Sequence, residues 1–125
     1  MAEDWANVAK EVVRHLVPGS ILALQGELGA GKTTFTQALA KELGVVKVPQ
    51  SPTFALMRSY VVPNHDGMKR LIHVDAYRLE DEKELMVLDL DEELADGVSV
   101  LVVEWPEKIA RWLSIQPNIF TCKLQ

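Results

Sequence analysis

The chain has 125 residues, of which 13 are basic and 18 are acidic, so its formal net charge is −5. This length supports one hydrophobic core and is too short for two domains, and the 48% apolar and 25% charged residues exclude a disordered chain. The single cysteine, Cys122, excludes an internal disulfide, and no apolar run approaches the ~20 residues of a membrane span.

The charge balance and the first residues narrow the class of protein further. A net negative charge argues against a dedicated nucleic-acid-binding protein, which usually has a basic excess. Residues 1–5 are acidic where a signal peptide is basic and then apolar. We therefore expect one cytoplasmic domain that comprises residues 1–125.

The first half of the chain predicts two helices around a buried strand. Apolar residues recur at helical spacing over 4–17, and Pro18 stops this helix. Residues 21–24 form a continuous apolar run, which is typical of a strand buried on both faces. After a glycine-rich turn, helical spacing returns over 32–43 and ends at Gly44. This succession opens an α/β unit.

The second half of the chain predicts a hairpin and then further helices and strands. Residues 54–62 and 71–74 are rich in β-formers and flank a cluster of turn formers at 63–67, which indicates an antiparallel hairpin. The remaining predicted elements are two short helices across 80–96 that break near Asp89, a buried strand at 98–103, a helix that begins at Pro106, and a strand at 119–124. The whole pattern favours an α/β fold with a parallel core and one antiparallel hairpin.

Acidic charge is concentrated in residues 80–96, where nine side chains are acidic and Lys83 alone is basic. Such a segment is either a solvated helical face or a docking surface for a basic patch on a partner protein.

Residues 26–33 match the phosphate-binding pattern G-x-x-x-x-G-K-[ST] at every fixed position. Backbone N–H groups must approach a phosphate closely, and Gly29 and Gly31 remove Cβ atoms that would obstruct them. The positive end of the following helix faces the anion. Lys32 adds a charge for the phosphates, and the Thr33 hydroxyl can bind Mg²⁺. The alternative is an ordinary glycine turn beside a surface lysine. The pattern arises by chance in about one in 250 chains of this length.

Two carboxylates stand at the ends of predicted strands. Mg²⁺ bound to phosphates needs a carboxylate, normally at the carboxyl end of a neighbouring buried strand. Asp75 follows the β-forming residues 71–74, and Glu104 follows residues 98–103, which are apolar except for Ser99. Either could bind the metal or orient the attacking water, and the alternative is a carboxylate that caps a turn.

Other polar and aromatic residues have two interpretations each. Trp105 either stacks on a base or a partner or belongs to the core. Ser51 and Thr53 precede the hairpin, either as a switch segment that senses a phosphate or as an ordinary turn. Arg78 alone among the arginines is placed to reach a phosphate, whereas His73 alternates with apolar residues and is interpreted as a satisfied core histidine.

Four blocks of sequence, taken in order, resemble the TsaE family, formerly YjeE. These are residues 26–35, 51–54 (Ser-Pro-Thr-Phe), 73–79 (His-Val-Asp-Ala-Tyr-Arg-Leu) and 103–108 (Val-Glu-Trp-Pro-Glu-Lys), and the resemblance covers about residues 5–115. Members of this family are bacterial ATPases of the tRNA threonylcarbamoyladenosine pathway. The resemblance implies a P-loop NTPase-like three-layer domain with a mixed sheet.

The resemblance also implies roles for individual residues. The residues on the nucleotide loop, which would bind ATP or ADP, are Leu28, Gly29, Ala30, Gly31, Lys32, Thr33 and Thr34. Lys32 would contact the phosphates and Thr33 would bind Mg²⁺, with Asp75 and Glu104 as metal or catalytic carboxylates. Trp105 is linked to activity in the family, and Ser51 and Thr53 match its switch-like segment.

The function implied is an Mg²⁺-dependent ATPase that serves as an accessory subunit of the complex modifying adenosine 37 of tRNA. Its partners would be TsaD-like and TsaB-like proteins, with tRNA contacted indirectly at most. Because no arginine finger is evident in the sequence, we expect slow hydrolysis by the chain alone. The alternatives are a binding switch that uses ATP without needing hydrolysis and a small-molecule kinase, although 125 residues leave little room for a kinase lid.

Overall fold

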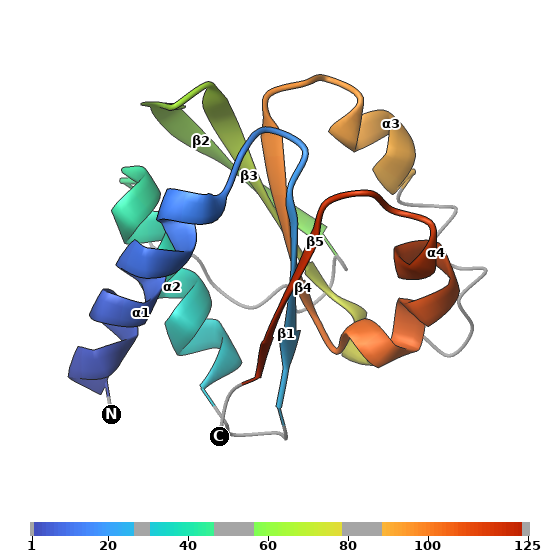
Figure 1. Cartoon of the computed structure of the whole chain (residues 1–125), viewed down its shortest axis with the longest axis horizontal. Coiled ribbons are helices and arrows are strands. Elements are labelled where there is room, and N and C mark those ends of the chain that lie inside the picture. The colour runs from blue at the N-terminus through green and yellow to red at the C-terminus, as the bar shows by residue number, and fades with distance from the viewer. Residues whose placement is uncertain (1, 27–30, 47–56, 79–88, 124–125) are drawn as a thin grey trace.

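The computed structural model describes residues 2–26, 31–46, 57–78 and 89–123 (Figure 1). These residues form a five-stranded sheet with helices on both faces, and the strand order is β2-β3-β4-β1-β5. The predicted α/β fold with a mixed sheet is confirmed.

The sheet is parallel except at one edge. Its strands are β1 (Ile21–Gln25), β2 (Met57–His65), β3 (Met68–Asp75), β4 (Ser99–Glu104) and β5 (Ile119–Lys123). β1, β3, β4 and β5 are parallel, and β2 pairs antiparallel with β3. All residues of β4 are buried, because its neighbours and the helices on both faces cover it. This burial explains the run of four apolar residues at 100–103.

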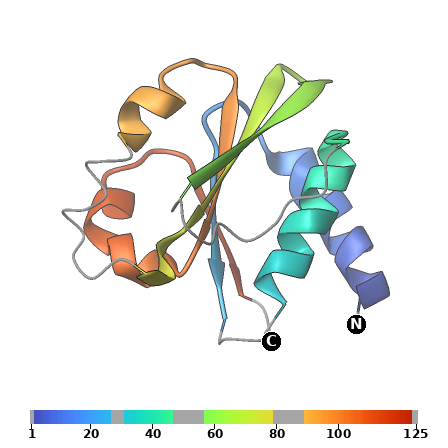
Figure 2. The ribbon, with the colours of Figure 1, turned by 180° about the vertical axis from the view of Figure 1, so that it is seen from behind.

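Helices cover the two faces of the sheet as separate layers (Figures 1 and 2). α1 (Ala2–His15) and α2 (Lys32–Leu43) pack on one face, and α3 (Leu90–Leu94), η3 (Pro106–Ile109) and α4 (Ala110–Ser114) lie on the other. Successive strand residues contribute to opposite cores, so Leu71 faces α1 and α2 while Ile72 faces α3 and α4. None of the described helices is long and apolar enough to cross a membrane.

The β2–β3 hairpin has a shorter turn than the sequence predicts. A turn over 63–67 is wrong in extent, because β2 continues to His65 and β3 begins at Met68. Pro63 is tolerated in β2 because this is an edge strand whose pairing shifts register between Val61 and His65.

Other boundaries differ slightly from the predicted ones. α1 ends at His15 rather than at residue 17, and Pro106 begins a 3₁₀ helix, η3, before the α-helix α4. The second of the two predicted acidic helices is α3. The first, as well as residues 54–56 and 124, lies outside the described residues.

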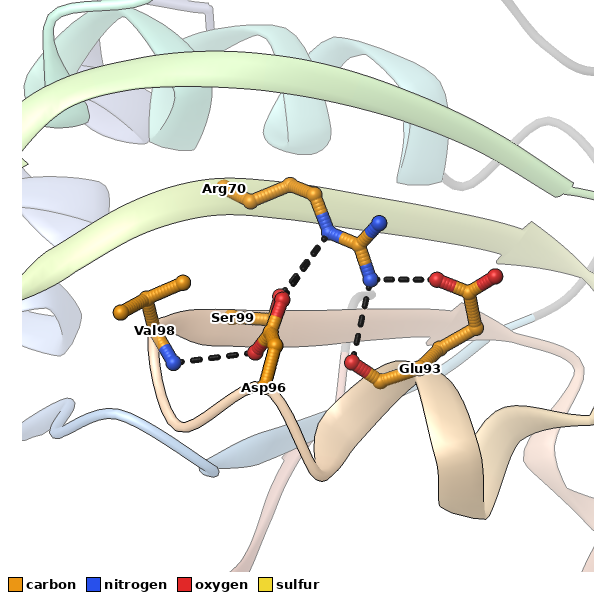
Figure 3. A network of polar contacts seen from close by, with 5 residues as sticks. All are labelled: Arg70, Glu93, Asp96, Val98 and Ser99. Atoms are coloured by element: carbon orange, nitrogen blue, oxygen red, sulfur yellow. Dashed lines mark hydrogen bonds and ion pairs between the residues drawn. The ribbon is translucent and has the colours of Figure 1, made fainter.

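A polar network joins α3 to β3 near the start of that strand (Figure 3). Arg70 on β3 forms an ion pair with Glu93 at 2.5 Å and one with Asp96 at 3.5 Å, and its Nε donates to Ser99 Oγ. Burial raises the pKa of Asp96, but hydrogen bonds from Ser99 and Val98 and the Arg70 charge outweigh it and lower that pKa overall. Part of the acidic segment therefore stabilises the fold and is not free to dock a partner.

Candidate functional site

The candidate site lies at the carboxyl edge of the sheet, where β1 and β4 end side by side. The chain leaves β1 for α2 on one face and leaves β4 for η3 and α4 on the other. Ligands in parallel α/β sheets bind in the crevice that such diverging connections leave open. This edge carries the glycine-rich segment that follows β1 in the sequence, and Glu104, the last residue of β4, with Trp105 after it.

The described part of the phosphate-binding motif begins α2. Gly31 has φ +96°, a left-handed conformation that favours glycine, and Lys32 is the first residue of the helix. A Cβ on Gly31 would lie 3.2 Å from Cζ2 of Trp5, so α1 packs closely against Gly31. The backbone N–H groups of the first turn of α2, at Lys32, Thr33 and Thr34, point out of the helix end. Leu28, Gly29 and Ala30 lie outside the described residues.

Lys32 is almost fully buried, with 6% of its surface exposed. Its Nζ donates a hydrogen bond to the Gly26 carbonyl and lies 3.9 Å from the ring centroid of Trp105. The lysine of the motif is therefore held at the carboxyl edge and is not the surface lysine of the alternative interpretation.

The two predicted carboxylates are neighbours across the sheet. Asp75 and Glu104 are register partners on β3 and β4, and Glu104 is also level with Leu24 on β1. Both carboxylates belong to the strand positions that face α1 and α2 and thus the start of α2. Asp75 also accepts a hydrogen bond from the Tyr77 backbone at 3.0 Å, so the turn-capping alternative describes part of its role.

Glu104 is buried and pairs with a histidine. Its Oε2 lies 2.5 Å from Nε2 of His73, which is fully buried on β3. Nδ1 of His73 has no hydrogen-bond partner among the described residues. The interpretation of His73 as a satisfied core histidine is thus wrong in one respect: the ring is buried, but it is only half satisfied and it contacts a candidate site residue.

Trp105 belongs to the core, as one of its two interpretations predicts, and stacking on a base or a partner stays a prediction. It packs against the core formed by η3, α4 and the sheet, and its ring also covers Lys32 and lies 5.0 Å from the Tyr77 ring. Its φ of +60° turns the chain sharply away from Glu104. The ring is therefore both a core element and a wall of the site.

The remaining predicted residues are less informative. Ser51 and Thr53 lie outside the described residues. Arg78 is the last residue of η1 (Ala76–Arg78), where the structure describes the backbone alone.

The described residues offer few ligands for a metal at this edge. Within the described residues, no three His, Cys, Asp or Glu side chains gather in a way that could hold a metal ion. Mg²⁺ is commonly held by one or two protein oxygens together with substrate phosphates. Thr33, Asp75 and Glu104 match that kind of donor set.

The chain matches one known protein family over its whole length. The family model described as "Threonylcarbamoyl adenosine biosynthesis protein TsaE" matches residues 1–125. The chain belongs to the TsaE family.

Relatives support this assignment at substantial identity. The "tRNA threonylcarbamoyladenosine biosynthesis protein TsaE" of Bacillus subtilis is 41% identical over 111 residues, which are 89% of this chain and 66% of that protein. The TsaE protein of Streptomyces coelicolor is 46% identical over 102 residues, which are 81% of this chain and 66% of that protein. The chain thus spans about two thirds of the length of these curated relatives.

A solved structure has the same fold. The crystal structure of Bacillus subtilis YdiB is similar with a TM-score of 0.68 and 31% identity, over 98% of this chain and 72% of that one. The likeness agrees with the P-loop NTPase-like arrangement of the sheet and the TsaE assignment.

Two residues at the candidate site of this TsaE family member, His73 and Tyr77, were not predicted as site residues from the sequence. His73 and Asp75 are two residues apart on one strand and therefore share a face, which is a signal that they act at the same site. Tyr77 of η1 packs against Trp105 with the two rings tilted by 44°, and nothing in its local sequence predicts that contact.

Proposed function

We propose that this chain binds ATP with Mg²⁺ at the carboxyl edge of β1 and β4 and hydrolyses it as an accessory subunit of the tRNA threonylcarbamoyladenosine machinery. The observation that carries the proposal is the placement of buried Lys32 at the same edge as Asp75 and Glu104. The TsaE family name, which refers to threonylcarbamoyl adenosine biosynthesis, supports the pathway.

The phosphates of ATP would bind at the start of α2. The N–H groups of its first turn and its positive helix end attract an anion. The Lys32 ammonium group now contacts a neutral carbonyl and a ring, and charged phosphate oxygens are stronger partners for it than either. Phosphates bound at this place would therefore be strong partners for the Lys32 ammonium group.

Mg²⁺ fits the oxygen ligands that this edge offers. Thr33, Glu104 and Asp75 are the residues that would hold it together with the phosphates. When bound, Mg²⁺ neutralises charge on the phosphates. Lys32 would add positive charge against the same groups, and one of the two carboxylates would orient the attacking water.

Partner proteins would set the rate of hydrolysis. TsaD-like and TsaB-like proteins are the proposed partners, and tRNA would be contacted indirectly at most. Because the sequence offers no evident arginine finger, hydrolysis by the chain alone would be slow and would rise when partners bind.

Release of phosphate from ATP, with and without the TsaD–TsaB pair, tests the proposal. We expect Lys32→Ala to weaken binding of a fluorescent ATP analogue at least tenfold, and Glu104→Gln to lower hydrolysis at least a hundredfold while the analogue still binds. Lys10→Ala is the matched control, because it removes a lysine charge from the exposed face of α1. Wild-type binding and hydrolysis by the Lys32 variant would refute the proposal.

A further inference from the structure

His73 and Glu104 form a buried pair between β3 and β4. The two side chains meet at 2.5 Å although 31 residues separate them in the sequence. His73 is fully buried, and the Glu104 side chain is 5% exposed. A buried carboxylate is costly unless a partner satisfies it, and His73 is that partner.

The apolar residues around His73 do not by themselves call for a histidine at this position. Its neighbours Leu71, Ile72 and Val74 are fully buried apolar residues, and an apolar side chain would suit the same core. Nδ1 of His73 finds no hydrogen-bond partner within the described part of the chain, which makes the ring an expensive core residue. A buried polar group that is only half satisfied calls for a functional explanation.

We propose that His73 is a positioning residue whose Nε2–H donates to Oε2 of Glu104 and fixes the orientation of that carboxylate. The inference rests on the proposed function, in which Glu104 acts at the phosphates. A side chain held through one oxygen presents its other oxygen in a constant direction, toward a metal or the attacking water. Partners behind a ligating group typically change metal affinity or activity 10–100-fold when they are removed.

Leu and Gln variants separate positioning from packing. His73→Leu fills the core but donates no hydrogen bond, whereas His73→Gln keeps an N–H at a similar reach. We expect the Leu variant to lower kcat for ATP at least tenfold with KM changed less than threefold, and the Gln variant to retain most of kcat. Ile72→Val is the matched control, since it perturbs the other face of the same strand.

A second readout does not depend on activity. Binding of a fluorescent ATP analogue is titrated with Mg²⁺, and the Mg²⁺ concentration needed for half-maximal binding should rise about tenfold in His73→Leu. The double variant His73→Leu, Glu104→Gln should need the same Mg²⁺ concentration as Glu104→Gln alone, because His73 acts through Glu104. Effects that multiply in the double variant would overturn the proposal.

The proposal can also be tested without a variant. Nitrogen NMR of the wild-type protein should show the ring hydrogen on Nε2 and an unprotonated Nδ1 for His73. A hydrogen on Nδ1 with a bare Nε2 would overturn the proposal even if His73→Leu failed to fold. If the wild-type protein neither binds nor hydrolyses ATP, the proposed function is refuted. If Glu104→Gln loses hydrolysis while His73→Leu stays fully active, only the positioning role is refuted.

Discussion

The Lys32 ammonium group lies 3.9 Å from the ring centroid of Trp105, a cation–π contact between the start of α2 and the end of β4. Tyr77 packs on the same indole, so three segments of the chain meet around one ring. Such contacts contribute about 1–2 kcal/mol when they are shielded from water. Trp105 therefore reports on the position of the lysine proposed to bind phosphate.

Nucleotide binding should change the fluorescence of Trp105. In a Trp5→Phe, Trp112→Phe protein, Trp105 is the single tryptophan. We expect ADP with Mg²⁺ to draw the Lys32 ammonium group from the ring to the phosphates and to alter the emission, because the charge beside the indole moves. A fluorescence titration measures the change.

Two further proteins control this experiment. The protein with Trp5→Phe and Trp105→Phe keeps Trp112 alone. The indole N–H of Trp112 donates to Asp91 on the face of the sheet opposite α2, and the emission of Trp112 should not respond to the nucleotide. Adding Lys32→Ala to the single-Trp105 protein should abolish the response. An unchanged Trp105 signal at saturating, independently measured ADP binding would contradict the prediction.

Replacing Gly31 by alanine should destabilise the fold more than replacing Gly19. Both have left-handed φ values, +96° and +92°, which cost an alanine about 1–2 kcal/mol. A Cβ on Gly31 also meets Trp5 at 3.2 Å, whereas one on Gly19 meets nothing within 4 Å. We expect about 1 kcal/mol more loss for Gly31→Ala in urea unfolding. The excess should disappear in a Trp5→Ala background, and its persistence there would argue against contact with Trp5.

Arg70 should be energetically coupled to Glu93. The pair lies at 2.5 Å, with both side chains 30% exposed, so solvent screens part of the attraction. We expect Arg70→Met to cost about 2 kcal/mol, because it also removes the hydrogen bond to Ser99. A double-mutant cycle with Glu93→Gln in urea unfolding should give a coupling of about 1 kcal/mol. Additive losses would show that the Arg70–Glu93 ion pair does not help to hold α3 on the sheet.

Asp96 should make stability depend on pH in the acid range. Its pKa in the folded protein is below the ordinary 3.8, so the ionised carboxylate stabilises the fold above that pH. This contribution is lost as the pH falls below 3.8 through the lower folded-state pKa. Asp96→Asn should therefore cost about 1 kcal/mol at pH 7 and progressively less below pH 3.8.

Urea unfolding at pH 7, 5 and 3 measures this effect. Glu107→Gln, at an exposed carboxylate of η3, controls for the loss of one negative charge. A penalty for Asp96→Asn that stays constant over the three pH values would contradict the assignment.

Local features of this protein were predictable from its sequence. Helical spacing located α2, and a continuous apolar run located β1 and β4, because each pattern reflects the repeat of one element. The phosphate-binding motif was equally visible, since the loop and the first turn of the next helix are one contiguous segment. The turn of the hairpin was predicted too long because the edge position of β2, which tolerates Pro63, is a property of the whole sheet.

The contacts that define the site were decided by the tertiary structure. Asp75 and Glu104 are level because β3 lies beside β4 in register, and no local pattern specifies that order of strands. The same pairing brings His73 onto Glu104, while the sharp turn at Trp105 brings its ring over Lys32. The sequence by itself determined the type and order of most described elements and contained the phosphate-binding motif. Which side chains meet there depended on strand order and register, because these contacts join residues far apart in the chain.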